Sequence, residues 1–517
     1  MTTASGLLSA FSRISVFTAL SRVLGFTRDI ILAAVLGIGP VSDAFFVAFK
    51  LPNLFRRLTA EGAMTSAFIP GYTGVEQSEG KTAAQHLAGE IQSLLVWVLL
   101  LILVVFELFM PYVITAMAPG FAFDGDISRF DGAIHLARLT MPYLPMVSLL
   151  ALWIAIGNVY GRFALGASVP VIMNLVMISG ALLAWFIWPD LDQDGVGYER
   201  AGIIALSVAT GGVIKLLIIG TMLWRMKSLP PIYFFPRLSP NSRTVWRRFW
   251  PAAIGSAGTQ INLLIDTILA SLLPIGAISQ LYFADRIAQL PLGVVGIALG
   301  VALLPTLSRL EQVKVVDTAA VRQVLRRGII IGMLAACPAL AGIMAISDDL
   351  IRGLFAYGAF DPAMVSSTAA VLMAYGAGIP AFILIKTLQP SFYAAGDTAT
   401  PMRITILSVG INIALSIMLM QIIGAAGLAL ATSISLWIST LILMLILRQR
   451  DRFEFSVFYP LIKIAAAAGV MAAGLVVIRH GLDHLAAWQA LVILMLSSAG
   501  IYLPLIYVMG VWRGLKG

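Results

Sequence analysis

The chain has 517 residues, of which 60% are hydrophobic and 11% charged, and its mean hydropathy of +0.95 lies far above that of soluble proteins. This composition excludes a soluble domain and predicts a polytopic membrane protein. The net charge of +9 does not indicate nucleic-acid binding, because the basic residues fall in short loops between apolar runs. A single cysteine, Cys337, excludes a disulfide framework and a thiolate metal site within one chain.

The apolar runs predict an all-α fold with about fourteen membrane-spanning helices. A spanning helix needs about 20 mostly apolar residues, and charge clusters, proline and glycine mark its ends. In chain order the predicted spans cover residues 12–38, 41–73, 84–116, 133–158, 166–188, 201–225, 246–273, 279–309, 320–347, 362–393, 402–420, 424–447, 460–479 and 486–511. Arg13 and Arg22 interrupt the first run, so we expect it to be retained as a span rather than cleaved as a signal peptide.

The loops between the predicted spans carry opposite charges on the two sides of the membrane. The basic loops cover residues 226–245, 310–319 and 448–459 together with the C-terminal tail. The acidic loops alternate with them and cover residues 124–131, 190–199 and 348–361. The excess of Lys and Arg places the basic loops and both termini in the cytoplasm. This arrangement requires an even number of spans.

The two halves of the chain resemble each other across the basic, proline-rich loop after the sixth span. DAFFVAFKLPNL (43–54) is matched by SQLYFADRIAQLPL (279–292), which places Lys50 opposite Arg286. Repeats of this kind are typical of transporters, which bind substrate at the repeat interface and expose it alternately to the two sides. The predicted parts are two pseudo-symmetric six-helix bundles at 1–228 and 229–447 and two additional helices at 448–517.

The first two predicted spans carry charges that apolar burial alone would forbid. A charge at bilayer depth costs about 3 kcal/mol or more, so such residues normally face a bundle interior or a water-filled cavity. One polar stripe runs down the second span from Asp43 through Lys50 to Glu61, and Arg22 and Asp29 share a face of the first span. We expect both stripes to line one cavity with a surplus of positive charge.

A cationic cavity predicts an anionic ligand, and guanidinium is the side chain best matched to phosphate. The predicted substrate-binding residues are Arg22, Arg28, Lys50, Arg56, Arg57 and Arg286. The predicted gating carboxylates are Asp29, Asp43 and Glu61, with Asp43 near the outer boundary. The alternative is that the charges at 28–29 and 56–57 are interfacial and reach toward the membrane surface.

Asp266 is a lone carboxylate in the middle of the seventh predicted span. A buried lone acid stays protonated, meets a cation, or is held by hydrogen bonds, here from Gln260, Asn262 or a facing helix. The sequence contains no glycine-rich phosphate-binding loop of a nucleotide-using enzyme, and its four histidines include no pair on one helix face within a span. It therefore predicts a transporter rather than an enzyme.

Five segments carry a resemblance to a known family. They are SRVLGFTRD (21–29), SDAFFVAFKLPNLFRRLTAEGAMTSAFIP (42–70), MAPGF (117–121), LYFADRIAQLPLGVVGIALGVALLPTLS (281–308) and SFYAAGDTATP (391–401). The chain resembles the MurJ/MviN family of lipid II flippases, within the multidrug/oligosaccharidyl-lipid/polysaccharide exporter superfamily. The resemblance implies a monomeric protein of the bacterial inner membrane that moves lipid II, an undecaprenyl-diphosphate-linked muropeptide, to the outer leaflet for peptidoglycan synthesis. Its implied partners are lipid II and membrane lipids, with no nucleic acid.

The resemblance also implies roles for single residues. Arg22, Arg28, Arg56 and Arg286 match the essential cavity arginines of the family, and Asp43 matches its functional carboxylate. The last two spans match helices that form, with the second half, a groove for the lipid tail. We expect alternating access driven by the membrane potential or by a cation.

Some family members bind sodium in their second half. By position Asp266, Asn412 and Thr432 match that site, whereas Ser416 stands where the family pattern has a second carboxylate. No other cofactor is expected.

Two alternatives remain open at this point. One is an exporter of another polyprenyl-linked glycan or of drugs within the same superfamily; a cation–drug antiporter would need acidic rather than arginine-rich walls. The other is a membrane-embedded glycan polymerase, which would need a catalytic carboxylate on an outer loop such as 120–132 or 188–200.

Overall fold

The computed structural model describes residues 4–59, 63–123, 127–189, 196–312 and 317–511. Across these residues the chain forms helices and no strand, which confirms the all-α prediction. Helices suit a membrane because each satisfies its own backbone hydrogen bonds where no water is available. The chain divides into two compact units, Met1–Ile278 and Ser279–Gly517. The boundaries predicted at 228 and 447 stay predictions.

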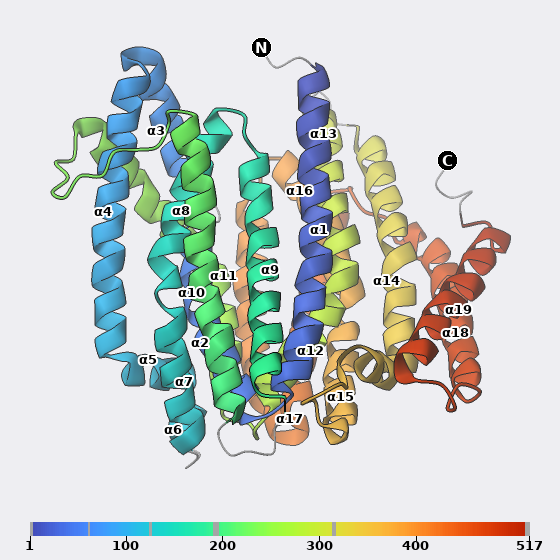
Figure 1. Cartoon of the computed structure of the whole chain (residues 1–517). Helices are drawn as coiled ribbons and strands as arrows, with labels where there is room; N and C mark the ends of the chain where they lie inside the picture. The colour runs from blue at the N-terminus through green and yellow to red at the C-terminus, as the bar shows by residue number, and fades with distance from the viewer. Residues whose placement is uncertain (1–3, 60–62, 124–126, 190–195, 313–316, 512–517) are drawn as a thin grey trace. The chain divides into compact units, whose positions relative to one another are not determined.

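The first unit contains eleven helices within its described residues. They are α1 (Ala4–Leu36), α2 (Pro40–Thr59), α3 (Ala63–Glu79), α4 (Lys81–Leu108), α5 (Met110–Met117), α6 (Pro119–Phe123), α7 (Ile127–Thr140), α8 (Tyr143–Val159), α9 (Ala164–Ile187), α10 (Val196–Arg225) and α11 (Pro240–Ser271). In Figure 1, α1, α9 and α10 lie close together, and α9 packs against both of the others.

Small residues bring α9 and α10 together. A Cβ atom added at Gly180 would lie 2.6 Å from the Cβ of Ser207, so only glycine fits at this crossing. Arg200, at the start of α10, is 2% exposed and donates hydrogen bonds to the carbonyls of Val35, Trp188 and Pro189. These carbonyls lie at the ends of α1 and α9, where a helix leaves its last acceptors unsatisfied. One buried guanidinium therefore provides hydrogen-bond donors for the terminal carbonyls of two helices.

The second unit begins at Ser279, within α12 (Ala277–Pro291). Its remaining elements are the π-helix η1 (Leu292–Gly296), α13 (Ile297–Glu311), α14 (Thr318–Phe355), the 3-10 helix η2 (Pro362–Met364), α15 (Val365–Gly376), α16 (Ile379–Ala394), α17 (Ala399–Gln449), the 3-10 helix η3 (Phe455–Val457), α18 (Phe458–Arg479) and α19 (Ala487–Val508). Figure 1 shows α14 alongside α18 and α19, and α14 contacts both.

A sharp kink divides α17 into two helical arms. Ile423 and Gly424 leave the helical conformation, and Gly424 has a φ of 58°, in the left-handed region that glycine tolerates best. This kink falls at the boundary between the predicted spans 402–420 and 424–447. The kink therefore agrees with the predicted break between these two runs, and their count as two separate spans stays a prediction.

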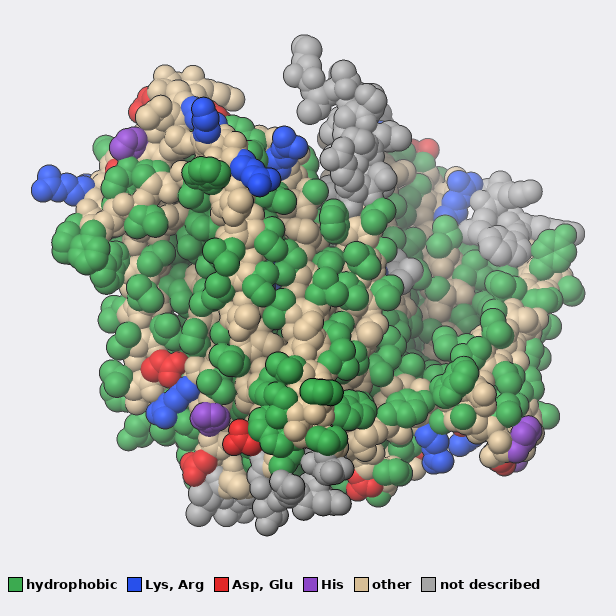
Figure 2. Space-filling view, in the orientation of Figure 1, with side chains coloured by type: hydrophobic (Ala, Val, Ile, Leu, Met, Phe, Trp, Pro, Cys, Tyr) green, Lys and Arg blue, Asp and Glu red, His purple; other side chains and the backbone are tan. Residues whose placement is uncertain are grey.

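The predicted spans coincide with one or more helices each, but several are divided. The fourth predicted span, 133–158, is shared between α7 and α8, and the tenth, 362–393, between η2, α15 and α16. The second, 41–73, includes residues 60–62, which lie outside the described ranges. Within the described ranges, nine helical segments are long and apolar enough to cross a membrane. A multi-pass membrane protein is therefore supported, and the count of fourteen stays a prediction. Over α4, α9 and α10, Figure 2 shows charged side chains near the helix ends and hydrophobic ones between them.

Candidate functional site

The first unit has a partly open cavity of about 420 Å³ lined by α1, α2, α8, α9 and α10. This volume lies within the range of small-molecule sites, about 300–1,000 Å³. Its lining includes three cationic side chains, Arg28, Arg56 and Lys215, and no Asp or Glu among the residues described there. The remaining lining is largely apolar, with Asn53, Tyr143 and Asn174 as neutral polar members. The cavity is therefore electropositive.

Arg28 is held in a fixed orientation at one wall of this cavity. Its Nε and Nη2 atoms both donate to Oδ1 of Asp29, at 3.0 and 2.7 Å, and its Nη1 donates to Oδ1 of Asn174 at 2.9 Å. Nδ2 of Asn174 in turn donates to the carbonyl of Ser21 at 3.0 Å, which fixes which end of the amide faces the guanidinium. Asp29 thus acts in this structure as the partner of Arg28, and its predicted gating role stays a prediction.

Arg56 reaches the cavity from α2. Its Nε donates to Oδ1 of Asn53 at 3.3 Å, and Nδ2 of Asn53 donates to the carbonyl of Phe49 at 2.7 Å. Asn53 and Phe49 also line the cavity. Because these three residues lie within two turns of one helix, α2 presents one face to the cavity, and Asn53 and Arg56 are its polar members.

Lys215 on α10 is a cavity cation that the sequence analysis missed. It is 1% exposed, and its Nζ donates to the Tyr143 hydroxyl at 2.8 Å and lies 4.4 Å from the centre of the Tyr143 ring. Sδ of Met173 is 3.4 Å away. A lone lysine in the apolar run of the sixth predicted span carried the same signal that identified Arg28, since intramembrane charges are costly and normally functional.

Lys50 does not line the cavity but joins α2 to α11. Its Nζ donates to Oγ1 of Thr267 at 3.0 Å.

Asp266, next to Thr267 on α11, accepts a hydrogen bond from Nδ2 of Asn262, four residues earlier on the same helix, at 3.4 Å. Asn262 is one of the partners that the sequence analysis offered for this carboxylate.

Asp43 forms a fully buried ion pair with Arg129 on α7. Arg129 Nη2 donates to Asp43 Oδ2 at 2.8 Å, both side chains are 0% exposed, and the guanidinium stacks 4.0 Å from the Phe121 ring centre. The backbone N–H of Gly276 donates to the same oxygen at 2.7 Å. Asp43 lies ten residues before Asn53 on α2, about 15 Å along the helix axis. The pair is therefore separate from the cavity, at the other end of α2.

Arg129 was also missed by the sequence analysis. It stands among aspartates in a loop that was assigned to the acidic side, where a single arginine gives no sign of burial. Only the packing of α7 against α2, with Phe121 of α6 against the guanidinium, reveals its role.

The structure does not place the other predicted substrate-binding and gating residues in this cavity. Arg22 is on the exposed surface of α1 and does not line the cavity. The Arg57 side chain and all of Glu61 lie outside the described residues. Arg286 belongs to the second unit, where its Nη2 donates to Oδ2 of Asp285 at 3.2 Å and its guanidinium lies 4.8 Å from the Tyr282 ring centre. The structure therefore brings Arg28 and Arg56 together in one cavity and adds Lys215.

In the second unit, Asn412 and Thr432 meet across the two arms of α17. Nδ2 of Asn412 donates to Oγ1 of Thr432 at 3.0 Å. Oδ1 of Asn412 and the Ser416 hydroxyl are buried, and neither makes a hydrogen bond to the described part of the chain. Among the described residues, no cluster of three or more His, Cys, Asp or Glu side chains could hold a metal ion. The oxygens gathered at this position are neutral ones.

A multi-pass helical membrane protein with a cationic cavity lined by its helices is a membrane transporter by fold and site. The MurJ family profile, described as Lipid II flippase MurJ, matches residues 32–498. The chain belongs to this family of lipid II flippases, which confirms the prediction of a transporter rather than an enzyme.

Individual relatives agree with this assignment. A protein of Rhizobium tropici named "Probable lipid II flippase MurJ" is 37% identical over 477 residues, which cover 92% of this chain and 87% of the relative. A lipid II flippase MurJ of Burkholderia cenocepacia is 32% identical over 520 aligned positions, covering 98% of each protein. A solved structure of lipid II flippase MurJ in an inward closed conformation is 24% identical, with a TM-score of 0.79 over 98% of this chain and 99% of its own. This last likeness supports the fold.

Proposed function

We propose that this protein moves lipid II from the cytoplasmic to the periplasmic leaflet of the bacterial inner membrane by alternating access. The observation that carries the proposal is the cavity in which Arg28, Arg56 and Lys215 meet and which has no carboxylate among its described lining residues. Family membership supplies the substrate class, and the cavity supplies a chemistry that fits it. A drug–cation exporter would need the opposite charge in the same place.

The cavity supports recognition of a diphosphate in three ways. Arg28 presents a planar fork of donors that matches phosphate oxygens, and the bonds that it donates to Asp29 and Asn174 hold that fork in place before substrate arrives. Arg56 adds a second guanidinium from the neighbouring helix. Lys215 contributes a compact charge whose position is set by the Tyr143 hydroxyl. The polyprenyl tail stays in the lipid, so only the headgroup has to enter.

The proposed cycle takes its energy from the membrane potential. Each elementary charge that crosses the membrane is worth about 2.3 kcal/mol per 100 mV. With the cell interior negative, an anionic headgroup is driven outward, and the emptied cationic cavity is drawn back. Arg22 and Arg286 are proposed to contact the headgroup at other stages of this cycle, and Asp43 to act in the outer gate.

The orientation proposed here places both termini in the cytoplasm, because the basic loops share one side of the predicted topology. The proposal is for a monomer, since one chain supplies the cavity. Crosslinking of the protein in native membranes tests this, because a recurrent dimer would contradict it.

A sodium ion is a second proposed ligand, in the second unit. The buried oxygens of Asn412 and Ser416, which make no hydrogen bond to the described chain, fit a monovalent cation, and Thr432 adds a hydroxyl beside them. Asp266 lies in the first unit, so its part in sodium binding is proposed from the family likeness alone. Asn412→Leu tests it through the sodium dependence of the melting temperature; a variant that keeps the dependence contradicts the site.

The experiment that tests the main proposal replaces Arg28 by alanine in a strain with no other copy of the protein. The readout is the leaflet distribution of lipid II, measured with a reagent that reaches only the outer leaflet. We expect lipid II to accumulate inside while the variant remains in the membrane. Arg138→Ala is the matched control, because Arg138 is 49% exposed and contacts Glu107 outside the cavity.

Three other outcomes would contradict the proposal. Normal growth and normal outer-leaflet lipid II with Arg28→Ala would remove the cavity from the transport path. Accumulation of lipid II in the outer leaflet would indicate a polymerase instead. Equal loss of transport with Arg138→Ala would show that any lost arginine disturbs the protein.

A further inference from the structure

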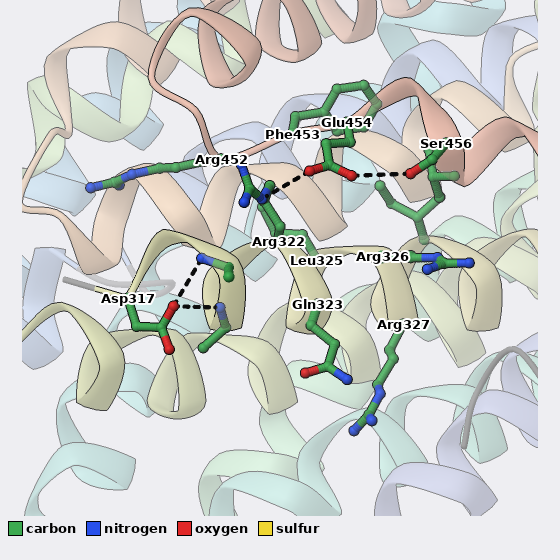
Figure 3. A pocket seen from close by; sticks show the side chains of 14 residues that line it. Asp317, Arg322, Gln323, Leu325, Arg326, Arg327, Arg452, Phe453, Glu454 and Ser456 are labelled. Atoms are coloured by element: carbon green, nitrogen blue, oxygen red, sulfur yellow. Dashed lines mark hydrogen bonds and ion pairs between the residues drawn. The ribbon is translucent and has the colours of Figure 1, made fainter. Parts of the chain in front are cut away.

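We propose that a pocket in the second unit binds the phosphate group of an anionic membrane phospholipid. The pocket has a volume of about 430 Å³ and is formed by the start of α14 and the segment between α17 and α18 (Figure 3). Its lining covers residues 317–329 and 452–457. Both α14 and α18 are long and apolar enough to span a membrane, so a pocket at their N-terminal ends lies at the membrane surface.

Arginine dominates the polar lining of this pocket. Four arginines, Arg322, Arg326, Arg327 and Arg452, line it together with two carboxylates, Asp317 and Glu454. The Asp317 carboxylate caps α14, because its Oδ1 accepts from the backbone N–H groups of Ala319 and Ala320 at 3.0 and 3.1 Å. Much of its hydrogen-bonding capacity is therefore already used inside the protein.

Two of the arginines build the walls. Arg322 bonds to Asp451 at 2.6 Å and to Glu454 at 3.2 Å, which ties α14 to the segment before α18. Arg452 bonds to Glu311 at 2.9 Å, with only 14% and 8% of the two side chains exposed. These bonds join α13, α14 and the α17–α18 connection, so the pocket is a built feature of the fold rather than a gap between loops.

Arg326 and Arg327 also line the pocket and carry positive charge at positions apart from the Arg322 and Arg452 ion pairs. In Figure 3 both side chains extend from α14 away from Glu454 and on the side opposite Asp317. Arg326 is exposed, and it lies on the same part of the pocket as Ser456. An oxyanion placed there would meet the Arg326 guanidinium and the start of η3 and α18, while Arg327 adds positive charge from the neighbouring face of α14. Basic pockets between membrane helices at the cytoplasmic surface are known to bind lipid headgroups of this chemistry.

The surroundings of the pocket favour a lipid over a soluble anion. Ile331, one turn beyond Arg327 on α14, is 44% exposed, and Tyr459 and Ile462 on α18 are 69% and 67% exposed. These side chains continue from the basic pocket onto the apolar surfaces of the same two helices. A phospholipid matches this arrangement of a polar pocket followed by an apolar surface, with its phosphate in the pocket and its acyl chains beside α14 and α18. Bound there, it would fasten α18 to α14.

The test compares lipid binding by the wild type and by Arg326→Gln/Arg327→Gln. Each protein is placed in nanodiscs of phosphatidylcholine alone or with added phosphatidylglycerol, and native mass spectrometry measures the phosphatidylglycerol that stays bound. The matched control is Arg247→Gln/Arg248→Gln, an adjacent exposed pair at the eighth and ninth positions of α11, just as the tested pair is the ninth and tenth of α14. We expect the pocket variant to retain roughly tenfold less phosphatidylglycerol and the control to match the wild type.

Further variants and a soluble-phosphate control show whether a loss of lipid binding comes from this pocket. Arg326→Lys/Arg327→Lys keeps the charge and is expected to restore binding, and Arg326→Gln alone, at an exposed position, guards against a folding failure of the double variant. Equal losses in the pocket and control pairs would show a general surface effect and overturn the site, as would no loss in either. If inorganic phosphate in phosphatidylcholine nanodiscs raises the melting temperature as much as phosphatidylglycerol does, the ligand is a soluble anion and the lipid assignment fails.

Discussion

Replacing Arg129 by methionine is the most direct way to measure what the buried ion pair with Asp43 contributes. Methionine keeps an unbranched apolar side chain against the Phe121 ring and removes the guanidinium. The 2.8 Å bond to Asp43 is then lost, while the 2.7 Å bond from the Gly276 N–H remains. The carboxylate stays buried without its cationic partner.

The expected cost follows from the complete burial of both side chains. Breaking a buried pair by removing one partner costs about 3–5 kcal/mol, because the remaining charge is left in a low-dielectric interior. Changing Asp43 to asparagine as well removes that charge and leaves an amide oxygen that can still accept from Gly276. We therefore expect the double variant to be more stable than Arg129→Met alone, with a coupling energy of about 2 kcal/mol or more between the two positions.

The assay is unfolding of the purified protein in mixed micelles by increasing SDS, followed by tryptophan fluorescence. Arg138→Met is the control, because its contact with Glu107 is 3.9 Å long and half exposed, and such pairs contribute about 1 kcal/mol or less. If Arg129→Met costs no more than this control, or if the two single costs simply add in the double variant, the burial argument is wrong.

Three further predictions concern the cavity, the helix packing and a surface loop. Lys215→Met removes a buried charged hydrogen bond and is expected to lower lipid II translocation roughly tenfold, measured by the leaflet assay. Gly180→Val places a Cβ atom 2.6 Å from a side chain of α10 and is expected to destabilise the protein by about 1–3 kcal/mol in SDS unfolding. The pKa of Asp397, in the loop before α17, is lowered to about 2 because its carboxylate accepts the Thr400 N–H and pairs with Arg450. Its stabilisation is complete above its unfolded pKa of about 3.9 and is lost as the pH falls toward 2, so Asp397→Asn should flatten the melting temperature across that window.

Each of these predictions has a matched comparison. Lys81→Met, at an exposed lysine, should leave translocation unchanged, and equal losses would argue against a special role for the cavity lysine. Gly469→Ala adds a Cβ where no atom lies within 4 Å, so a similar destabilisation there would contradict the packing explanation. If the wild type and Asp397→Asn lose stability in parallel on acidification, other carboxylates control that transition.

The helices and part of the cavity followed from the sequence because both depend on local composition. Apolar runs of sufficient length must form helices in a membrane, and Arg28 was recognisable because its own neighbours are apolar. The same rule applied to Lys215 would have completed the cavity. Division of single apolar runs into α7 and α8 or α15 and α16 was not predicted, since each run is long enough for one helix.

Contacts between helices that are distant in the chain could not be predicted from the sequence, for a different reason. Asp43 was placed in an outer gate by its position, but its partner Arg129 stands in a segment whose composition is that of a solvated acidic loop. Arg22 and Asp29 were assigned to one face of the first span on helical spacing, yet Arg22 is exposed whereas Asp29 is buried and bonded to Arg28. The helices that pack against a helix decide which of its sides faces a cavity. The sequence alone does not specify those packing partners.

The carboxylate-poor wall of the cavity in the first unit also affects what occupies it before lipid arrives. Arg28 is paired with Asp29, but cationic groups outnumber carboxylates among the described residues at this cavity. Anions such as chloride or phosphate are therefore expected to concentrate there. An incoming diphosphate must displace them, and their release into bulk solution favours binding entropically. Raising the ionic strength removes this gain, and substrate affinity should then fall even though no protein contact changes.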